Sequence, residues 1–360
     1  MTVTLDDGCR LAADYFPAGE AGSEARKEGS PGTVLIRTPY GKADYGPQAE
    51  SWNRAGFDVV VQDVRGRYGS SGDWIPYATE GDDGTATVQD LEARGLLHGP
   101  LLLAGASYDA HCALETARVL ETVRALETPE GSPPGLARPT AVVAMVPALG
   151  LFETAYDPQG NPRFRDRIGW WHQHGFGRES GPGLSGPELD GLVARAGQDG
   201  PLGLMDDAVH GPGVHGPGAA AAWHRLWEAP PLDLHARYGH LGTPLLVIGG
   251  RKDFFAEETI RLADAWAQGR TELLWGPWGH RLAKDLGPQE ARALRDQGGL
   301  LGCIRDWART LPDVPMTREF TETRPGHFAW RRTERARLRH EPESHASQAS
   351  LDTPHESRTS

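Results

Sequence analysis

Short apolar runs alternate with amphipathic stretches along most of the chain. Two runs rich in β-branched residues, 32–40 and 57–66, are typical of strands buried on both faces of a parallel sheet, and the segment between them is long enough for a crossover helix. Residues 108–126 carry apolar positions at three- and four-residue spacing, which predicts a helix. The alternation continues with a helix expected at 80–97 and strands at 100–107, 140–149, 243–253 and 270–280. Repeated β and α segments predict an α/β fold with a doubly wound, mostly parallel sheet.

The N-terminal segment follows a different pattern. An Asp7-Gly8 turn between two short alternating runs predicts a β-hairpin over residues 3–16. The next residues, 18–32, are small, charged and punctuated by Gly and Pro, so we expect an exposed loop there.

A segment rich in Gly, Pro, Trp and His, residues 151–240, interrupts the α/β rhythm. It predicts a helical cap inserted over an active site, between core parts at 1–150 and 241–315. The alternative is a helical subdomain whose tryptophans form its own core, because Trp usually serves to bury apolar area. Residues 331–360 are polar with few large apolar groups, which predicts a disordered tail.

Charge and composition exclude several classes of partner. The formal net charge is −12 and no cluster of Lys and Arg forms a stripe, so we expect no nucleic acid. The chain lacks a leader-like start and a run of eighteen apolar residues, which predicts a cytoplasmic protein with no membrane partner. Three widely spaced cysteines are expected to be reduced and structural. A homodimer is left open.

The strand-to-helix turn at Gly105-Ala106-Ser107 is a candidate nucleophile site. A nucleophile elbow needs small residues around the serine, because the sharp turn brings helix and strand close together. Gly105 meets this demand, whereas Asp109 stands where the G-x-S-x-G pattern has its second glycine. The alternative is an ordinary connection in which Ser107 caps the helix.

Two further residues strengthen the catalytic interpretation. Asp253 follows one late apolar run and His280 follows the next, so the chain order is serine, acid, histidine. This is the order of the triad in α/β-hydrolases, with the acid and the histidine in loops after late strands.

Five sequence motifs together resemble those of the X-Pro dipeptidyl-peptidase and cocaine esterase family of serine hydrolases. The resemblance covers roughly residues 1–310. The motifs are RTPYGK (37–42), VVVQDVRGRYGSSGDW (59–74), GASYDAHCAL (105–114), TPLLVIGGRKDFF (243–255) and GPWGH (276–280). The resemblance implies an α/β-hydrolase fold, and we expect no cofactor. We also expect no metal, because the His172/His174 and His210/His215 pairs have no carboxylate or Cys ligands nearby at recognised spacing.

The resemblance also implies a role for individual residues. Ser107 would be the nucleophile, His280 the general base and acid, and Asp253 the residue that orients the imidazole. The oxyanion hole would be formed by the Tyr40 hydroxyl and the Tyr108 backbone N–H. Further residues proposed to line the pocket are Asp109, Trp170, Trp171, His172, His174, Phe254 and Trp278.

Asp63 and Arg65 lie near a strand end in the second of these motifs. They could bind substrate, but we expect them to pair with each other and hold the loop together.

Three departures from the family pattern limit what can be carried over. Asp109 replaces a small residue in the elbow, and it could raise the pKa of His280 and alter what the pocket accepts. Family members usually carry a C-terminal β-sandwich domain, and we expect that domain to be missing here. The segment before the serine is also shorter than expected, so we do not expect dipeptidyl-peptidase activity.

Three functions remain open at this point. The first is a serine hydrolase that cleaves an ester of a small acylated molecule, as a specialised tailoring enzyme in a natural-product pathway. The second is a lyase with the same site, in which His280 acts as a base and an acyl group leaves as carboxylate to form an alkene. The third is a non-catalytic binding module on the same fold.

Overall fold

A mixed β-sheet forms the centre of the computed structural model, which describes residues 1–19, 32–127, 140–175, 177–205, 217–266, 270–311 and 314–340. Its strand order is β1-β2-β4-β3-β5-β6-β7-β8-β9-β10. The strands from β4 to β9 in this order run parallel, whereas β2 is antiparallel to both β1 and β4, and β10 is antiparallel to β9. The strands are β1 (Thr2–Thr4), β2 (Arg10–Phe16), β3 (Thr33–Thr38), β4 (Asp58–Asp63), β5 (Leu101–Ala106), β6 (Thr140–Met145), β7 (Leu245–Gly250), β8 (Thr271–Gly276), β9 (Met316–Arg324) and β10 (His327–Arg332).

Helices cover both faces of this sheet because the central strands are apolar on both sides. Leu35 and Val60 belong to one buried cluster, and their neighbours Val34 and Val59 belong to a second cluster on the other face. The first cluster includes residues of α3 (Glu80–Ala93), α4 (Tyr108–Glu127), α10 (Leu234–Tyr238) and α11 (Ala256–Ala265). The second includes residues of α2 (Gly46–Arg54), α12 (Pro288–Asp296) and α13 (Gly299–Thr310). The predicted doubly wound α/β architecture is confirmed.

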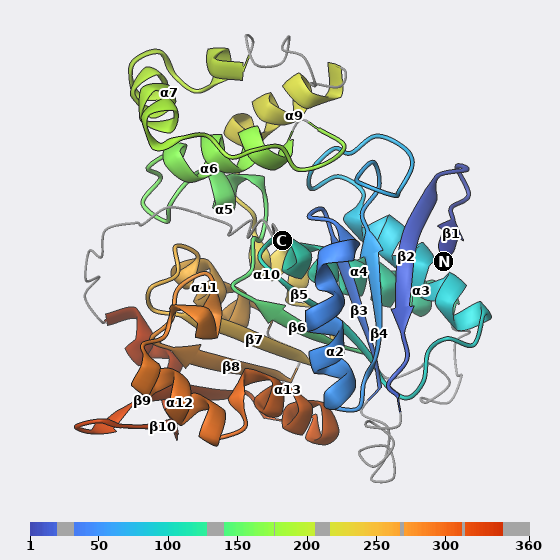
Figure 1. Cartoon of the computed structure of the whole chain (residues 1–360), viewed down its shortest axis with the longest axis vertical. Helices are drawn as coiled ribbons and strands as arrows, with labels where there is room; N and C mark the ends of the chain where they lie inside the picture. The colour runs from blue at the N-terminus through green and yellow to red at the C-terminus, as the bar shows by residue number, and fades with distance from the viewer. Residues whose placement is uncertain are drawn as a thin grey trace, which may run out of the picture.

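The chain between β6 and β7 forms a group of helices with its own core. Figure 1 shows α6, α7 and α9 gathered at one end of the molecule, beyond the sheet. Ile168, Trp171, Trp223 and Leu226 are fully buried in this group, which we call the cap. Its elements are α5 (Leu151–Ala155), α6 (Phe164–Trp170), η2 (Trp171–Gly175), α7 (Gly186–Asp199), η3 (Leu202–Met205) and α9 (Pro217–Glu228).

The C-terminal region holds strands that the sequence analysis did not predict. β9 pairs with β8 from Glu272↔Met316 onward, and Phe320 of β9 is fully buried in the second core cluster. Residues 331–340, expected in the disordered tail, contain the end of β10 and the 3-10 helix η5 (Arg335–His340). The sequence of β9 is largely polar because only some of its positions are buried. Residues 341–360 lie outside the described part of the chain.

The remaining local predictions have mixed outcomes. The N-terminal hairpin is confirmed, since β1 and β2 pair antiparallel with Thr2 opposite Ala12. Most of the loop expected at 18–32 lies outside the described residues. None of the helices described is both long enough and apolar enough to cross a lipid bilayer.

Candidate active site

Ser107 occupies a strained turn between β5 and α4. Its φ angle is 56°, in the left-handed region that residues with a side chain rarely adopt. The Ser107 N–H donates to the carbonyl of Met145 at the end of β6 (2.9 Å), and the Ser107 carbonyl accepts from Ala110 and His111 in the first turn of α4. The surroundings therefore hold the serine in a conformation that costs free energy, as expected of a nucleophile elbow.

Gly105 allows α4 to begin directly against β5. A Cβ atom at this position would lie 2.2 Å from the carbonyl carbon of Asp109. Only glycine fits this contact, which satisfies the requirement that we expected at this position. Asp109 does not need to be small, because its side chain leaves the turn toward Tyr45 Oη, which donates to it at 2.5 Å.

His280 and Asp253 meet at the carboxyl ends of β8 and β7. His280 Nδ1 lies 2.9 Å from Asp253 Oδ1. The Asp253 side chain is buried, and the histidine side chain is 22% exposed. Because the carboxylate accepts this hydrogen bond, the proton sits on Nδ1 and the second ring nitrogen, Nε2, keeps its lone pair.

The two loops that carry this pair are joined to each other. The Lys252 N–H donates to the carbonyl of Trp278 at 3.1 Å. A Cβ at Gly250 would lie 2.2 Å from that carbonyl oxygen, so the close approach requires glycine. Phe254 stacks on the imidazole with ring centroids 4.3 Å apart, which fixes the ring orientation further.

Ser107 is not hydrogen-bonded to His280 within the described residues. Both residues nevertheless lie at the carboxyl edge of the same parallel strands, β5 and β8, with β6 and β7 between them. In enzymes without substrate, catalytic hydrogen bonds are often long and tighten only in the complex.

Tyr40 lies just after β3 with its hydroxyl oriented by the cap. Trp170 Nε1 donates to Tyr40 Oη at 3.1 Å, which leaves the phenol proton free for another acceptor. The Tyr40 ring makes an edge contact with His174, with centroids 5.1 Å apart. Burial, followed by the charge of Asp109, raises the pKa of Tyr40, so the hydroxyl is protonated at neutral pH.

Tyr108 supplies the first backbone N–H of α4, which has no acceptor within its own helix. Its side chain is fixed elsewhere: the hydroxyl donates to Glu80 and accepts from the Tyr77 N–H. The Tyr108 ring stacks on Trp170 at 5.9 Å. The N–H that follows Ser107 is thus available at a helix N-terminus, where the dipole favours negative charge.

Three residues predicted to line the pocket are either buried in a core or exposed. Trp171 is fully buried in the cap core against Trp223. Trp278 is fully buried in the core and stacks on Phe320, 6.3 Å away. The side chain of His172 is exposed. Burial of apolar area accounts for both tryptophans, and for Trp171 the alternative interpretation of the cap had anticipated this.

Asp63 and Arg65 do not pair with each other. Asp63 accepts from the N–H groups of Lys42 (2.7 Å) and Gly69 (3.1 Å), which stabilises the loops after β3 and β4. Arg65 donates instead to Asp83, with which it forms a two-pronged contact, and to Asp7. Both residues hold loops, but through other partners.

Sequence reasoning missed residues that connect the site to the cap. Arg163 of the cap donates to the backbone carbonyl of Phe254 and pairs with the buried Glu258 at 2.6 Å. Arg67 donates to backbone carbonyls in the cap, those of His174 and Gly177. No local spacing marks these pairs, because each joins segments about a hundred residues apart.

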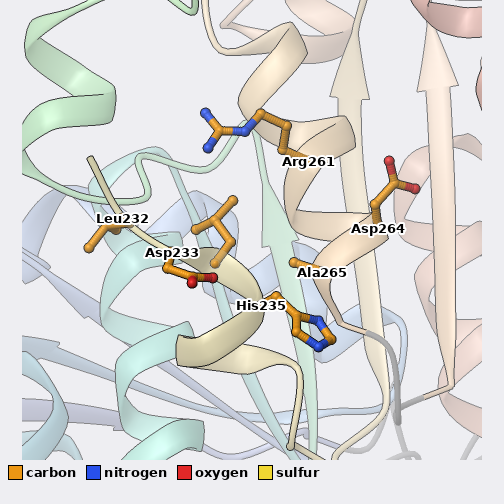
Figure 2. A pocket seen from close by; sticks show the side chains of 7 residues that line it. Leu232, Asp233, His235, Arg261, Asp264 and Ala265 are labelled. Carbon is orange, nitrogen blue, oxygen red and sulfur yellow. The ribbon is translucent and has the colours of Figure 1, made fainter.

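Two surface hollows lie away from the serine. Figure 2 shows the first, where Asp233 and His235 lie opposite Arg261 and Asp264. Its acids already have structural roles: Asp233 caps α10, and Asp264 pairs with Arg335 at 3.0 Å. The second lies between α5 and α11 and is lined by Phe152, Glu153, Tyr156, Asp157, Pro158, Gln159, Gly160, Pro231, Glu257, Glu258 and Arg261. Neither of these two hollows is lined by Ser107, His280 or Tyr40.

Comparison with known proteins agrees with this geometry. Residues 7–129 match the model of the X-Pro dipeptidyl-peptidase (S15 family). The cocaine esterase of Rhodococcus sp. (strain MB1 Bresler) is 24% identical over 304 residues, which cover 78% of this chain and 48% of that protein. In both comparisons the chain is similar to the X-Pro dipeptidyl-peptidase and cocaine esterase family. It spans about half the length of this relative.

Solved structures support the fold. An α-amino acid ester hydrolase has a TM-score of 0.58 at 16% identity, covering 91% of this chain and 57% of its own. An aminopeptidase from a marine sediment archaeon (Thaumarchaeota archaeon) has a TM-score of 0.57 at 17% identity, covering 92% of this chain and 57% of its own. The fold is that of the α/β-hydrolases.

Proposed function

We propose that the protein is a serine hydrolase that cleaves an ester bond of a small acylated molecule. Ser107 Oγ attacks the ester carbonyl carbon while His280 Nε2 takes the hydroxyl proton. The histidine then gives that proton to the leaving alcohol, and water releases the acyl group in the reverse sequence. Asp253 holds the proton on Nδ1 and stabilises the imidazolium.

Negative charge on the substrate oxygen is stabilised by two donors. One is the Tyr40 hydroxyl, whose proton is free because Tyr40 accepts from Trp170. The other is the Tyr108 N–H at the start of α4. Removing one donor from an oxyanion hole typically costs about 10²–10³ in kcat, so both contribute substantially to the rate.

One observation carries this proposal above the others. Ser107 is held at φ 56° on a strand-to-helix turn, at the same sheet edge as a buried Asp253 that accepts from His280. A serine that only capped a helix would not need this strain, because a helix N-cap normally has extended backbone angles.

In this proposal, the enzyme is a tailoring enzyme and its natural substrate is a small acylated molecule. Trp170 stacks on Tyr108, the residue after Ser107, and Phe254 stacks on His280. Aromatic rings beside both groups favour a compact, apolar acyl group. Loss of a carboxylate from the substrate with formation of an alkene, in place of an alcohol product, would indicate that the same site works as a lyase.

Active-site labelling tests the nucleophile. We expect a fluorophosphonate to form a covalent adduct on Ser107, detected by peptide mass spectrometry, because the probe reacts with serines that have an adjacent base. Ser107→Ala should abolish the adduct, and His280→Ala should reduce its rate by at least about 10³. Ser51→Ala is the matched control and should leave labelling unchanged, because the Ser51 hydroxyl donates only to the carbonyl of Pro47 within α2. A folded wild-type protein that gains no adduct would contradict the proposal.

A further inference from the structure

Asp109 is a buried acid beside Ser107 without a basic partner. It is 4% exposed and lies in the first turn of α4. Its Oδ2 accepts from Tyr45 Oη at 2.5 Å, and its Oδ1 has no hydrogen-bond partner among the described residues. Within that same part of the chain, no Lys, Arg or His lies within ion-pair distance of it. A negative charge here would act on its neighbours with little screening.

A series of hydrogen bonds connects Asp109 to the backbone of Tyr40. Tyr45 Oη and Thr38 Oγ1 are 2.8 Å apart, and the Tyr40 N–H donates to Thr38 Oγ1 at 3.1 Å. Because Tyr45 donates its own proton to Asp109, Thr38 must be the donor to Tyr45. The Tyr40 N–H, the Thr38 hydroxyl and the Tyr45 hydroxyl therefore donate one to the next, ending at Asp109. This series of hydrogen bonds orders the end of β3 and the Tyr40 backbone that follows it.

Two buried groups of opposite charge influence the Tyr40 hydroxyl. After burial itself, Asp109 raises the pKa of Tyr40, whereas Arg167 on α6 lowers it. The titratable groups that face Asp109 are Tyr45 on η1 (Lys42–Tyr45), Tyr40 after β3 and Cys112 on α4. Burial raises the pKa of all three, so they stay neutral near pH 7.

We propose that Asp109 is a positioning residue whose charge state sets how well Tyr40 stabilises the oxyanion, with the neutral acid as the more active form. This inference rests on the proposed function. When Asp109 is ionised, it makes the Tyr40 hydroxyl a poorer proton donor and repels charge that develops on the substrate oxygen. When it is neutral, Oδ2 still accepts from Tyr45, so the ordering is kept and the repulsion is absent.

Burial raises the pKa of Asp109 to about 7, which brings this change of charge into the range where ester hydrolysis is measured. The reactivity of the wild type should therefore fall as pH rises above 7, because Asp109 loses its proton. Asp109→Asn keeps an oxygen for Tyr45 and cannot ionise, so the fall should be absent.

The experiment measures kcat/KM for p-nitrophenyl acetate and the rate of Ser107 labelling by a fluorophosphonate across pH, on the full chain. Between about pH 6 and about pH 9, we expect the ratio of Asp109→Asn to wild type to rise about tenfold. A purely structural role would change the ratio equally at every pH.

Glu258→Gln is the matched control. Burial raises the pKa of Glu258 to about 7 as well, but this acid lies on the Asp253 side of the site. This variant should keep the decline in reactivity at high pH. A decline that persists in Asp109→Asn, or disappears in Glu258→Gln, would overturn the inference.

Tyr45→Phe gives a second test if Asp109→Asn does not fold. The Tyr45 hydrogen bond lowers the pKa of Asp109, so its removal should move the decline to higher pH. A decline at the wild-type pH would overturn the inference. Absence of Ser107 labelling at every pH in the folded wild type would instead overturn the proposed function, and the inference with it.

Discussion

At the scale of single residues, the serine turn depends on the absence of one side chain. Gly105 faces the backbone of Asp109 so closely that a Cβ would lie 2.2 Å from its carbonyl carbon and 2.3 Å from its oxygen. Neither β5 nor α4 can move freely, because both pack in the core with fully buried residues such as Leu103 and Leu114. The strain of an added methyl group must therefore displace the turn that holds Ser107.

We predict that Gly105→Ala lowers the free energy of unfolding by about 2 kcal/mol, since backbone must shift within a packed core. It should also slow fluorophosphonate labelling of Ser107 by at least about 10², because small misplacement of reacting groups costs that much. Gly186→Ala, at a helix start with open space around it, should change stability by under about 0.5 kcal/mol. Denaturant unfolding and labelling rates together test this; equal behaviour of the two variants would contradict it.

At the scale of elements, Glu115 connects α4 to the segment that follows the cap. Its two oxygens accept from Arg237 (2.8 and 2.7 Å), Tyr238 (2.7 Å) and Arg118 (2.9 Å). Burial alone would raise the pKa of Glu115, but His111 and the bonds from Arg237 outweigh this and lower it to about 2. The helix that begins just after Ser107, α4, is thereby fixed to α10 by a charged contact.

We predict that Glu115→Gln lowers the free energy of unfolding at neutral pH by about 2 kcal/mol, because Arg237 loses its carboxylate partner. A carboxyl group with a lowered pKa stabilises the fold above its unfolded pKa of about 4.3, and this stabilisation is lost as pH falls toward 2. The difference between wild type and variant, measured by urea unfolding, should therefore shrink as the pH is lowered from 6 to 3. A difference independent of pH would show that Glu115 acts through packing alone.

At the scale of the whole molecule, the sequence predicted the centre of the sheet better than its C-terminal edge. Strands such as β4 and β7 are buried at every position, so a short apolar run identifies them. The triad candidates follow from strand ends in a fixed chain order. The role of Tyr45 could not be predicted from strand ends, because its hydrogen bond to Asp109 depends on how the 3-10 helix η1 packs on α4.

The same argument explains why β9 was missed and what it contributes. Most positions of β9 are partly exposed, so its sequence is polar and lacks the apolar run that predicts a buried strand. The strand is instead held between β8 and β10, with which it pairs. Phe320 of β9 belongs to the second core cluster and stacks on Trp278. Trp278 lies in the loop that also carries His280. The edge of the sheet therefore supports the loop that carries His280.

We predict that Phe320→Ala destabilises the protein by about 3–5 kcal/mol, the usual cost of deleting a buried aromatic side chain. Labelling of Ser107 should slow even below the unfolding temperature, because Trp278 loses its stacking partner and the His280 loop loosens. Phe328→Ala, one strand further out and only partly buried, should cost about 1 kcal/mol and leave labelling intact. Thermal unfolding and labelling rates decide the matter. Equal stability of the two variants would contradict this prediction. It would show that β9 adds little to the stability of the His280 loop, which would then be held by its contacts with the loop after β7.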